Sequence, residues 1–315
     1  MPPTYRPRRS ILFVPGSNRR ALERARDLPA DGLIFDLEDA VAPGAKAEAR
    51  IAAAAALAAG GYGRRERVLR VNALSTAWGE ADLAAAATMP LDAVLLPKVE
   101  RAGQVDDAVA ALDRAGAPAS LELWCMLETP RGILAAAEIA AANPRVTALV
   151  AGTSDLTKEL HARHTRERGP VATALGLLLL AARAYGQAAL DGVHLDIADH
   201  EGFAEACEQG KALGFDGKTL IHPSQIEIAN RVFAPAASEL AWARRVIAAH
   251  AEATARSAGV ALVDGRLVEN LHVEEARRVV AIAEAIAQIE EADRPSGSDA
   301  GESRAGCVDT SRNGV

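Results

Sequence analysis

The sequence has 315 residues, half of them apolar, but only eleven are aromatic (5 Phe, 3 Trp and 3 Tyr). Its 42 acidic and 35 basic residues give a net charge of −7, which disfavours a general binder of nucleic acid or of anionic membranes. No apolar run approaches the roughly 20 residues of a membrane span, and the three cysteines lie too far apart for a disulfide framework. We therefore expect a cytoplasmic, alanine-rich α/β protein.

Short apolar runs alternate with alanine-rich amphipathic segments along most of the chain. In chain order we expect strands at 11–14, 32–37, 67–71, 93–96, 121–127, 146–150, 192–197 and 218–221. Helices are expected at 19–27, 45–59, 80–87, 102–115, 133–141, 171–185, 203–213 and 224–232. Most strand runs are continuously apolar, which is typical of parallel strands that are buried on both faces.

The number and spacing of these units predict a TIM (β/α)8 barrel. A doubly wound open sheet is the second choice, because the VPGSN segment after the first run does not match the GxGxxG fingerprint of that fold.

We expect the barrel to occupy residues 1–234 and a C-terminal helical extension and lid to occupy 235–292. The extension is predicted to contain a helix from 238 to about 258, a hairpin at 260–269 that turns at Asp264-Gly265, and a last helix at 272–289. Residues 293–315 contain few apolar side chains, so we expect a disordered tail there.

Ionisable side chains follow several predicted strands, at the end of the barrel where the chemistry of this fold takes place. Glu128 and Asp155 come directly after two consecutive strands. Two carboxylates with water completing the shell suit Mg²⁺. Each residue also has a structural alternative, since Glu128 could stabilise the N-terminus of the next helix and Asp155 could cap its own helix.

Arg70 lies at the end of the third predicted strand, where a guanidinium could bind a substrate carboxylate through two hydrogen bonds. An ion pair with a carboxylate of the DLED segment is an equally good interpretation. Lys98 is expected to pair with Glu100 or with the acidic residues at the strand ends. His161 and His164 have no third ligand nearby in sequence, so a solvated turn is favoured over a metal site there.

Eight segments at these positions resemble, in the same order, the citrate lyase β-subunit-like group of the HpcH/HpaI aldolase family, which includes malyl-CoA and citramalyl-CoA lyases. The segments are RRSILFVPGSN, LIFDLEDAV, LRVN, VLLPKVE, MLETPRGI, AGTSDL, DGVHLDIAD and GFDGKTLIHPSQI. The resemblance extends from about residue 8 to residue 289.

The resemblance implies a trimeric or hexameric Mg²⁺-dependent lyase that cleaves a 3-hydroxyacyl-CoA into a 2-oxo acid and acetyl-CoA. It places Glu128 and Asp155 at the metal ligands and Arg70 at the substrate carboxylate, and Glu128 also in contact with the substrate. It also implies that the CoA ester lies near Arg20 and Arg24.

By the same resemblance, Asp196 lies near the thioester. The lid residue that exchanges a proton with the acetyl carbon corresponds to Glu269, where the family commonly has aspartate. A citrate lyase β subunit that acts on a carrier-bound citryl group remains an alternative. A second alternative is an enzyme that hydrolyses the thioester, either as a malyl-CoA thioesterase or with the overall reaction of a malate synthase. A third alternative is a non-catalytic protein that binds CoA esters.

Overall fold

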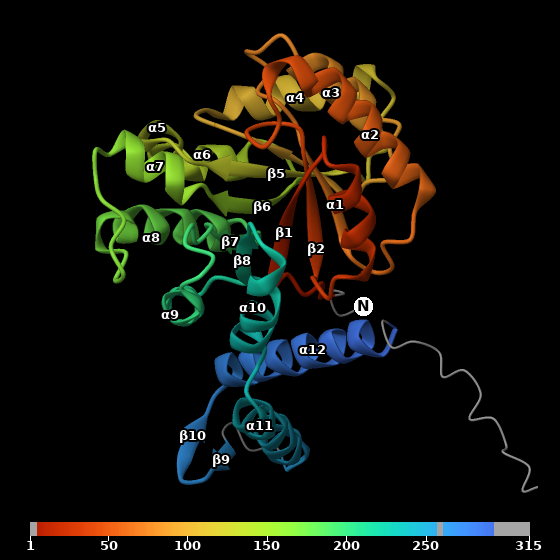
Figure 1. The fold of residues 1–315 in the computed structure, drawn as a ribbon. Coiled ribbons are helices and arrows are strands. Elements are labelled where there is room, and N and C mark those ends of the chain that lie inside the picture. The colour runs from red at the N-terminus through yellow and green to blue at the C-terminus, as the bar shows by residue number, and fades with distance from the viewer. Residues whose placement is uncertain (1–4, 257–260, 293–315) are drawn as a thin grey trace, which may run out of the picture.

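The computed structural model describes residues 5–256 and 261–292 and contains a closed barrel of eight parallel strands (Figure 1). The order of the strands around the barrel follows the sequence, and β8 closes the barrel against β1. The strands are β1 (Ser10–Pro15), β2 (Gly32–Asp36), β3 (Glu66–Arg70), β4 (Ala93–Leu96), β5 (Glu122–Leu127), β6 (Val146–Ala151), β7 (Ala188–Asp191) and β8 (Gly217–Leu220). This architecture confirms the predicted TIM barrel.

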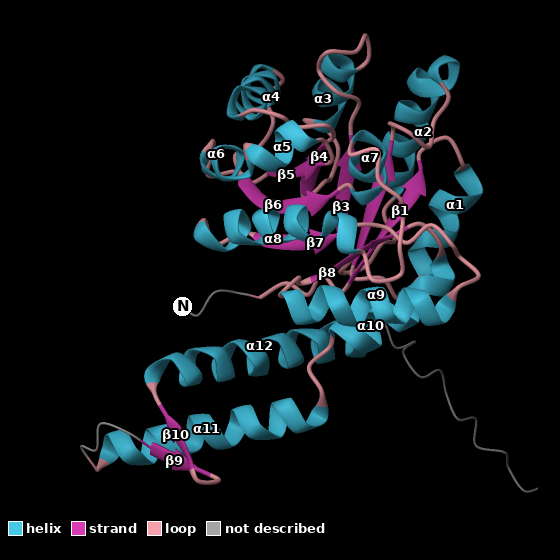
Figure 2. Cartoon of the chain, turned by 90° about the vertical axis from the view of Figure 1, so that its left-hand side faces the viewer, coloured by secondary structure: helices cyan, strands magenta, loops and turns pink. Residues whose placement is uncertain are grey.

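Helices connect the strands and cover the outside of the barrel (Figures 1 and 2). They are α1 (Arg19–Arg24), α2 (Lys46–Ala59), α3 (Gly79–Ala86), α4 (Ala102–Arg114), α5 (Pro130–Leu134), α6 (Ala136–Ala141), α7 (Thr153–Glu159), α8 (Gly169–Ala184), α9 (His200–Leu213) and α10 (Ile226–Phe233). Short 3-10 turns at Ala25–Asp27, Pro43–Ala45 and Pro223–Gln225 adjoin α1, α2 and α10.

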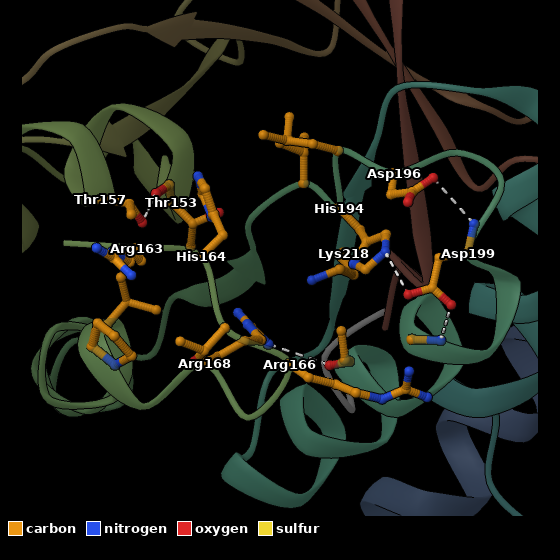
Figure 3. Close-up of a pocket in the computed structure, with 17 residues that line it drawn as sticks. Thr153, Thr157, Arg163, His164, Arg166, Arg168, His194, Asp196, Asp199 and Lys218 are labelled. Carbon is orange, nitrogen blue, oxygen red and sulfur yellow. Dashed lines mark hydrogen bonds and ion pairs between the residues drawn. The ribbon is translucent and has the colours of Figure 1, made fainter.

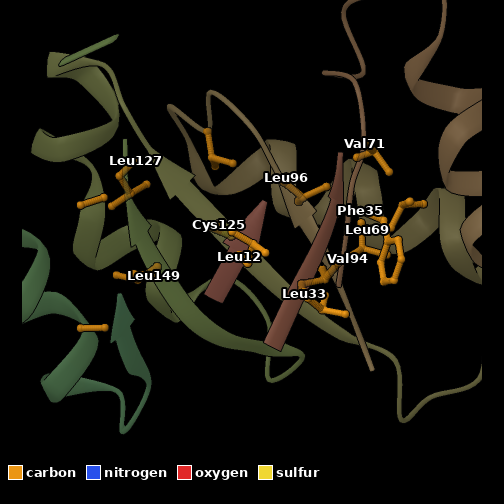
Figure 4. Close-up of a cluster of buried hydrophobic side chains, with 14 of the residues drawn as sticks. Leu12, Leu33, Phe35, Leu69, Val71, Val94, Leu96, Cys125, Leu127 and Leu149 are labelled. Atoms are coloured by element: carbon orange, nitrogen blue, oxygen red, sulfur yellow. The ribbon is translucent and has the colours of Figure 1, made fainter. Parts of the chain in front are cut away.

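The core has two layers because successive side chains of a strand point to opposite faces. One set of strand residues fills the inside of the barrel, among them Ile11, Ile34 and Trp124. The alternating set, which includes Leu12, Leu33 and Cys125, packs against the helices (Figure 4). Alanine is frequent on the buried helix faces, and its small side chain lets the helices pack closely against the strands.

The seventh strand differs from the prediction. Residues 192–197 alternate between apolar and polar side chains, but they form a loop in which Leu195 and Ile197 are exposed. The strand instead comprises Ala188–Asp191, which pairs with β6 on one side and β8 on the other. Pairing with two neighbouring strands thus prevails over the weak β-propensity of an alanine-rich segment.

The C-terminal residues form α11 (Ala237–Ala255), a hairpin of β9 (Ala261–Val263) and β10 (Arg266–Val268), and α12 (Asn270–Ala292). The hairpin turns at Asp264 and Gly265, as expected, and both have positive φ angles (49° and 76°). These elements lie beyond the amino ends of the barrel strands, where Arg9 Nη1 is 3.2 Å from Glu290 Oε1 (Figures 1 and 2).

The predicted disordered tail lies outside the described residues, and the division at residue 234 stays a prediction. Across the described helices, none combines the length and the apolar character needed to cross a membrane.

Candidate active site at the carboxyl ends of the strands

A cavity of about 400 Å³ opens at the carboxyl ends of the barrel strands. Several strands and the loops after them contribute side chains to it, including Arg70, Glu128 and Asp155, three of the residues selected from the sequence. Its other lining residues are Phe13, Pro15, Asp36, Asp39, Ala40, Met126, Ala151, Gly152, Thr153, Ser154, Val193, Leu195, Thr219 and Ile221. The barrel therefore brings together residues that are up to 208 positions apart in sequence, from Phe13 to Ile221.

Glu128 follows β5 directly and is buried, with 3% of its surface exposed. Its Oε1 accepts a hydrogen bond of 2.8 Å from the backbone N–H of Lys98. Burial raises the pKa of the Glu128 carboxyl to about 7, although the charge of Lys98 opposes this rise. The helix that follows is capped by Thr129, whose side chain accepts from Gly132 N. The alternative role of Glu128 at this helix N-terminus stays a prediction.

Asp155 lies in the first turn of α7, a helix that the sequence analysis did not predict. The N-cap of α7 is Gly152, so the alternative role of Asp155 as a cap is not realised. One third of the Asp155 side chain is exposed, and its Oδ2 is 3.8 Å from Lys98 Nζ. The neighbouring Ser154 Oγ is buried in the cavity without a hydrogen-bond partner.

The guanidinium of Arg70 lies in the cavity wall, where carboxylates of the DLED segment bind it. Its Nε and Nη2 donate to the two oxygens of Asp36 at 2.7 and 2.6 Å. Its Nη1 is 2.9 Å from Glu38 and 3.7 Å from Asp39. Although burial opposes it, these acidic partners raise the pKa of Arg70. The ion pair weighed as an alternative is thus present, and it holds Arg70 in a fixed orientation beside the cavity.

Lys98 contacts carboxylates on both sides of the cavity: those that follow β2, and Glu128 and Asp155. Its Nζ donates to Glu38 Oε1 and lies within 4 Å of Asp39 and Asp155, while its N–H holds Glu128. Its backbone adopts a positive φ of 51°, which is uncommon for a residue other than glycine. The pairing of Lys98 with the acidic residues, rather than with Glu100, required the tertiary structure.

The residues around Glu128 and Asp155 fit a hard divalent cation. Both side chains supply the oxygen ligands that Mg²⁺ prefers. Burial disfavours the negative charge of Glu128, and a bound cation would stabilise that charge. The buried Ser154 hydroxyl has no hydrogen-bond partner, and a water molecule bound to the cation would supply one. Within the described ranges, no cluster of three or more His, Cys, Asp or Glu side chains is arranged to hold a metal, so the fit concerns this carboxylate pair.

Glycine at position 152 is a feature of the site that the sequence analysis did not single out. A Cβ at this position would lie 2.2 Å from Glu128 Cβ and 2.7 Å from Glu128 Oε2. Only glycine therefore lets the chain between β6 and α7 approach the Glu128 side chain so closely. The sequence contains a signal for this close approach, since the AGTSDL segment has a glycine between the end of a strand and Asp155.

Four of the selected residues do not line this cavity. Arg20 and Arg24 are exposed on α1, and no ion pair involves either of them in the described parts of the chain. Asp196 is exposed in the loop after β7 rather than at a strand end, and its Oδ1 accepts from the N–H of Ala198. Glu269 follows β10 in the extension, at the opposite end of the barrel from the cavity (Figure 2). The roles expected for these residues stay predictions.

Comparison with known proteins supports the resemblance seen in the sequence. A family model described as HpcH/HpaI aldolase/citrate lyase matches residues 9–223. A (3S)-malyl-CoA thioesterase of Cereibacter sphaeroides strain KD131 is 53% identical over 281 residues, which cover 89% of this chain and 96% of that protein. The citrate lyase subunit beta of Escherichia coli K12 is 39% identical, covering 89% and 94% of the two chains.

Among solved structures, CitE of Mycobacterium tuberculosis in complex with magnesium, acetoacetate and coenzyme A superposes with a TM-score of 0.70 at 34% identity. The match covers 87% of this chain and 97% of that one. A second structure from the same organism, described as citrate lyase beta subunit, holds oxaloacetate and magnesium and covers 73% of this chain at 36% identity, with a TM-score of 0.63. The chain therefore belongs to the HpcH/HpaI aldolase/citrate lyase family.

Proposed function

We propose that this protein is a Mg²⁺-dependent enzyme that hydrolyses a short 3-hydroxyacyl-CoA thioester of the malyl-CoA type. The observation that carries the proposal is the convergence of Glu128, Asp155 and Arg70 on one cavity. The choice of hydrolysis is supported by the malyl-CoA thioesterase with 53% identity over nearly its whole length. The magnesium found in the CitE structures supports the choice of metal.

Glu128 and Asp155 would hold the metal, and Arg70 would bind the carboxylate of the acyl group. Magnesium bound there supplies a Lewis acid for an oxygen of the substrate. Because Asp36 fixes two nitrogens of Arg70, the guanidinium presents its remaining edge in one orientation. This edge is shared with Glu38 and Asp39, so substrate binding would replace a contact to one of them.

Asp39 is the carboxylate we assign to proton transfer. Of the four cavity carboxylates, Asp36 accepts two short hydrogen bonds from Arg70, and Glu128 and Asp155 are assigned to the metal. Asp39 is exposed, and its contacts to Arg70 Nη1 and Lys98 Nζ are longer, at 3.7 Å each. Asp39 takes a proton from the attacking water, whose oxygen bonds to the thioester carbon. The carbon–sulfur bond then breaks, and the leaving CoA thiolate takes up the proton.

Carbon–carbon cleavage to a 2-oxo acid and acetyl-CoA is the second candidate. It is favoured by the citrate lyase β subunit with 39% identity and by the CitE complex with coenzyme A. In that reaction a carboxylate must exchange a proton with the acetyl carbon, the role expected for Glu269. Glu269 follows β10 in the extension, beyond the amino ends of the strands of its own barrel, whereas the cavity lies at their carboxyl ends. A second copy of the chain in a homotrimer or hexamer would therefore have to supply it.

The test incubates the enzyme with (3S)-malyl-CoA and Mg²⁺ and identifies the products by mass spectrometry. Hydrolysis gives malate and free CoA, whereas carbon–carbon cleavage gives glyoxylate and acetyl-CoA. Glu128→Gln and Asp155→Asn should abolish Mg²⁺-dependent turnover while the protein remains folded, and Glu138→Gln on the exposed face of α6 is the matched control. Wild-type turnover in either site variant would refute the metal assignment, and acetyl-CoA as the first product would refute hydrolysis.

The role of Asp39 has its own test. Asp39→Asn should lower kcat for hydrolysis by roughly 10²-fold or more, which is the usual contribution of a general base. Mg²⁺ affinity, measured by calorimetry, should remain close to that of the wild type. An unchanged kcat would remove Asp39 from the reaction.

A further inference from the structure

Three charged side chains form a buried cluster on the outer face of β7 and β8. Asp191 and Lys218 are opposite each other in the strand pair, and both are almost completely buried, with 0% and 1% of their surface exposed. Lys218 Nζ is 2.7 Å from Asp191 Oδ2. Arg168, from the loop before α8, donates through Nη1 to Asp191 Oδ2 at 2.9 Å and through Nη2 to Asp191 Oδ1.

This cluster contains more positive than negative charge. The single carboxylate of Asp191 is shared by two cations, and across residues 5–256 and 261–292 no other acidic group forms an ion pair with Arg168 or Lys218. The three groups therefore carry a net charge of +1 when all are ionised. A buried charge without a counter-charge is unfavourable, so the cluster is electrostatically incomplete without an anion.

The cluster borders a cavity of about 460 Å³ that is lined by both cations (Figure 3). His194 also faces it, and the buried Nε2 of His194 has no hydrogen-bond partner. Arg163 and His164 add basic groups at the rim, and no hydrogen bond or ion pair of their side chains is found among the described residues. Lys218, His194 and Arg163 thus offer N–H groups to one space.

Two acidic residues at the rim do not neutralise this arrangement. Asp199 caps α9 through a 2.8 Å hydrogen bond from Gly202 N to its Oδ1, and its Oδ2 is 4.0 Å from His194 Nε2. Asp196 is exposed and accepts hydrogen bonds from backbone N–H groups of its own loop. Both carboxylates are thus engaged at the opening of the cavity, and neither forms an ion pair with Lys218 or Arg168.

Part of the cavity lining is apolar. Pro170, Val171 and Ala206 belong to this part, and Val193 and Leu195 line both this cavity and the one at the barrel mouth. A ligand that fits this space combines an anionic group with an apolar body. The volume exceeds that of a lone oxyanion, whose share of space is close to that of a few water molecules at about 30 Å³ each.

We propose that this cavity binds the phosphate group of a small organic phosphate, at a site separate from the cavity that holds Glu128 and Asp155. Lys218 and Arg163 would donate to phosphate oxygens, and His194 Nε2 would donate to a third. Phosphate offers several acceptor oxygens and more negative charge than a carboxylate, which suits a cluster of three separate donors. The phosphate could belong to a free metabolite or to the nucleotide part of a CoA ester.

Isothermal calorimetry with inorganic phosphate tests the site directly, at constant ionic strength. Lys218→Met should weaken phosphate binding at least about tenfold, the loss expected for one charge-assisted hydrogen bond. The matched control is Lys211→Met on α9, because Lys211 contacts Ala234 O and Glu239 outside the cavity. Lys218→Met leaves a neutral Asp191–Arg168 pair, so thermal unfolding should show a folded protein.

Arg163→Gln, at the exposed rim, provides a second variant that cannot disturb the buried cluster, and it should also weaken phosphate binding. The same titration with CoA identifies the source of the phosphate. Loss of CoA binding in both variants assigns the site to the CoA nucleotide, and retained CoA binding with lost phosphate binding assigns it to a separate metabolite. The absence of saturable phosphate binding, or wild-type affinity in both variants, would overturn the proposal.

Discussion

Replacing Gly152 by alanine should disable the candidate metal site through a single methyl group. The added Cβ would lie 2.2 Å from Glu128 Cβ and 3.2 Å from Glu128 Cα, and only Oε2, at 2.7 Å, belongs to the flexible end of that side chain. Because Glu128 is buried and its backbone follows a barrel strand, the strain cannot be relieved by a simple rotation. Overpacking of this kind costs about 1–3 kcal/mol of unfolding free energy.

For a chain of this size each kcal/mol corresponds to about 2–4 °C in Tm, so we expect Tm to fall by about 2–12 °C. The larger effect should be on function. A shift of about 1 Å in a positioned group costs roughly 10²-fold in rate, so turnover should fall by about that factor. Mg²⁺ affinity should fall with it, because Glu128 is one of only two protein ligands in the proposed site.

The assay combines differential scanning calorimetry, Mg²⁺ titration by isothermal calorimetry, and turnover of malyl-CoA. Gly176→Ala is the control, because the structure leaves open space around the position of its added Cβ in α8. That variant should keep its activity and gain about 0.5–1 kcal/mol of stability from the higher helix propensity of alanine. If Gly152→Ala bound Mg²⁺ and turned over substrate like the wild type, the close approach of Gly152 to Glu128 would have no functional role.

Three further predictions concern charged groups. Asp191→Asn leaves two buried cations without a carboxylate and should cost about 3–5 kcal/mol in urea unfolding; a loss below 1 kcal/mol would show that the cluster is not held by charge. Burial favours a higher pKa for Asp92, but the stronger effect of hydrogen bonds and charge from Arg67 lowers it. The resulting stabilisation is complete above the unfolded-state pKa of Asp92 and is lost as pH falls through its folded-state pKa. In Asp92→Asn the free energy of unfolding should therefore fall less steeply towards acid pH than in the wild type. Profiles of unfolding free energy against pH that run parallel in the two proteins would contradict this. Arg70→Lys removes the two-pronged pairing with Asp36 and should lower kcat/KM at least about tenfold; equal kcat/KM would exclude a geometric role.

Much of the barrel could be predicted because its strands are buried on both faces. Continuous apolar runs such as Leu33–Phe35 and Val94–Leu96 have few alternatives to a central parallel strand, and the strand ends then locate Glu128 and Arg70. The seventh strand could not be found in this way. Its residues Ala188–Asp191 have weak β-propensity, while the loop that follows shows a misleading alternation.

The sequence alone determined the fold class, the family and the residues that stand at the strand ends, because hydrophobic periodicity and motif order are properties of the chain itself. Only the tertiary structure decided which charges meet. It pairs Arg70 with Asp36, directs Lys98 towards Glu38 and Glu128, and places Glu269 far from the cavity of its own barrel. These outcomes depend on strand register, loop conformation and the docking of the extension, which bring distant residues within a few ångströms and leave no local signal in the sequence.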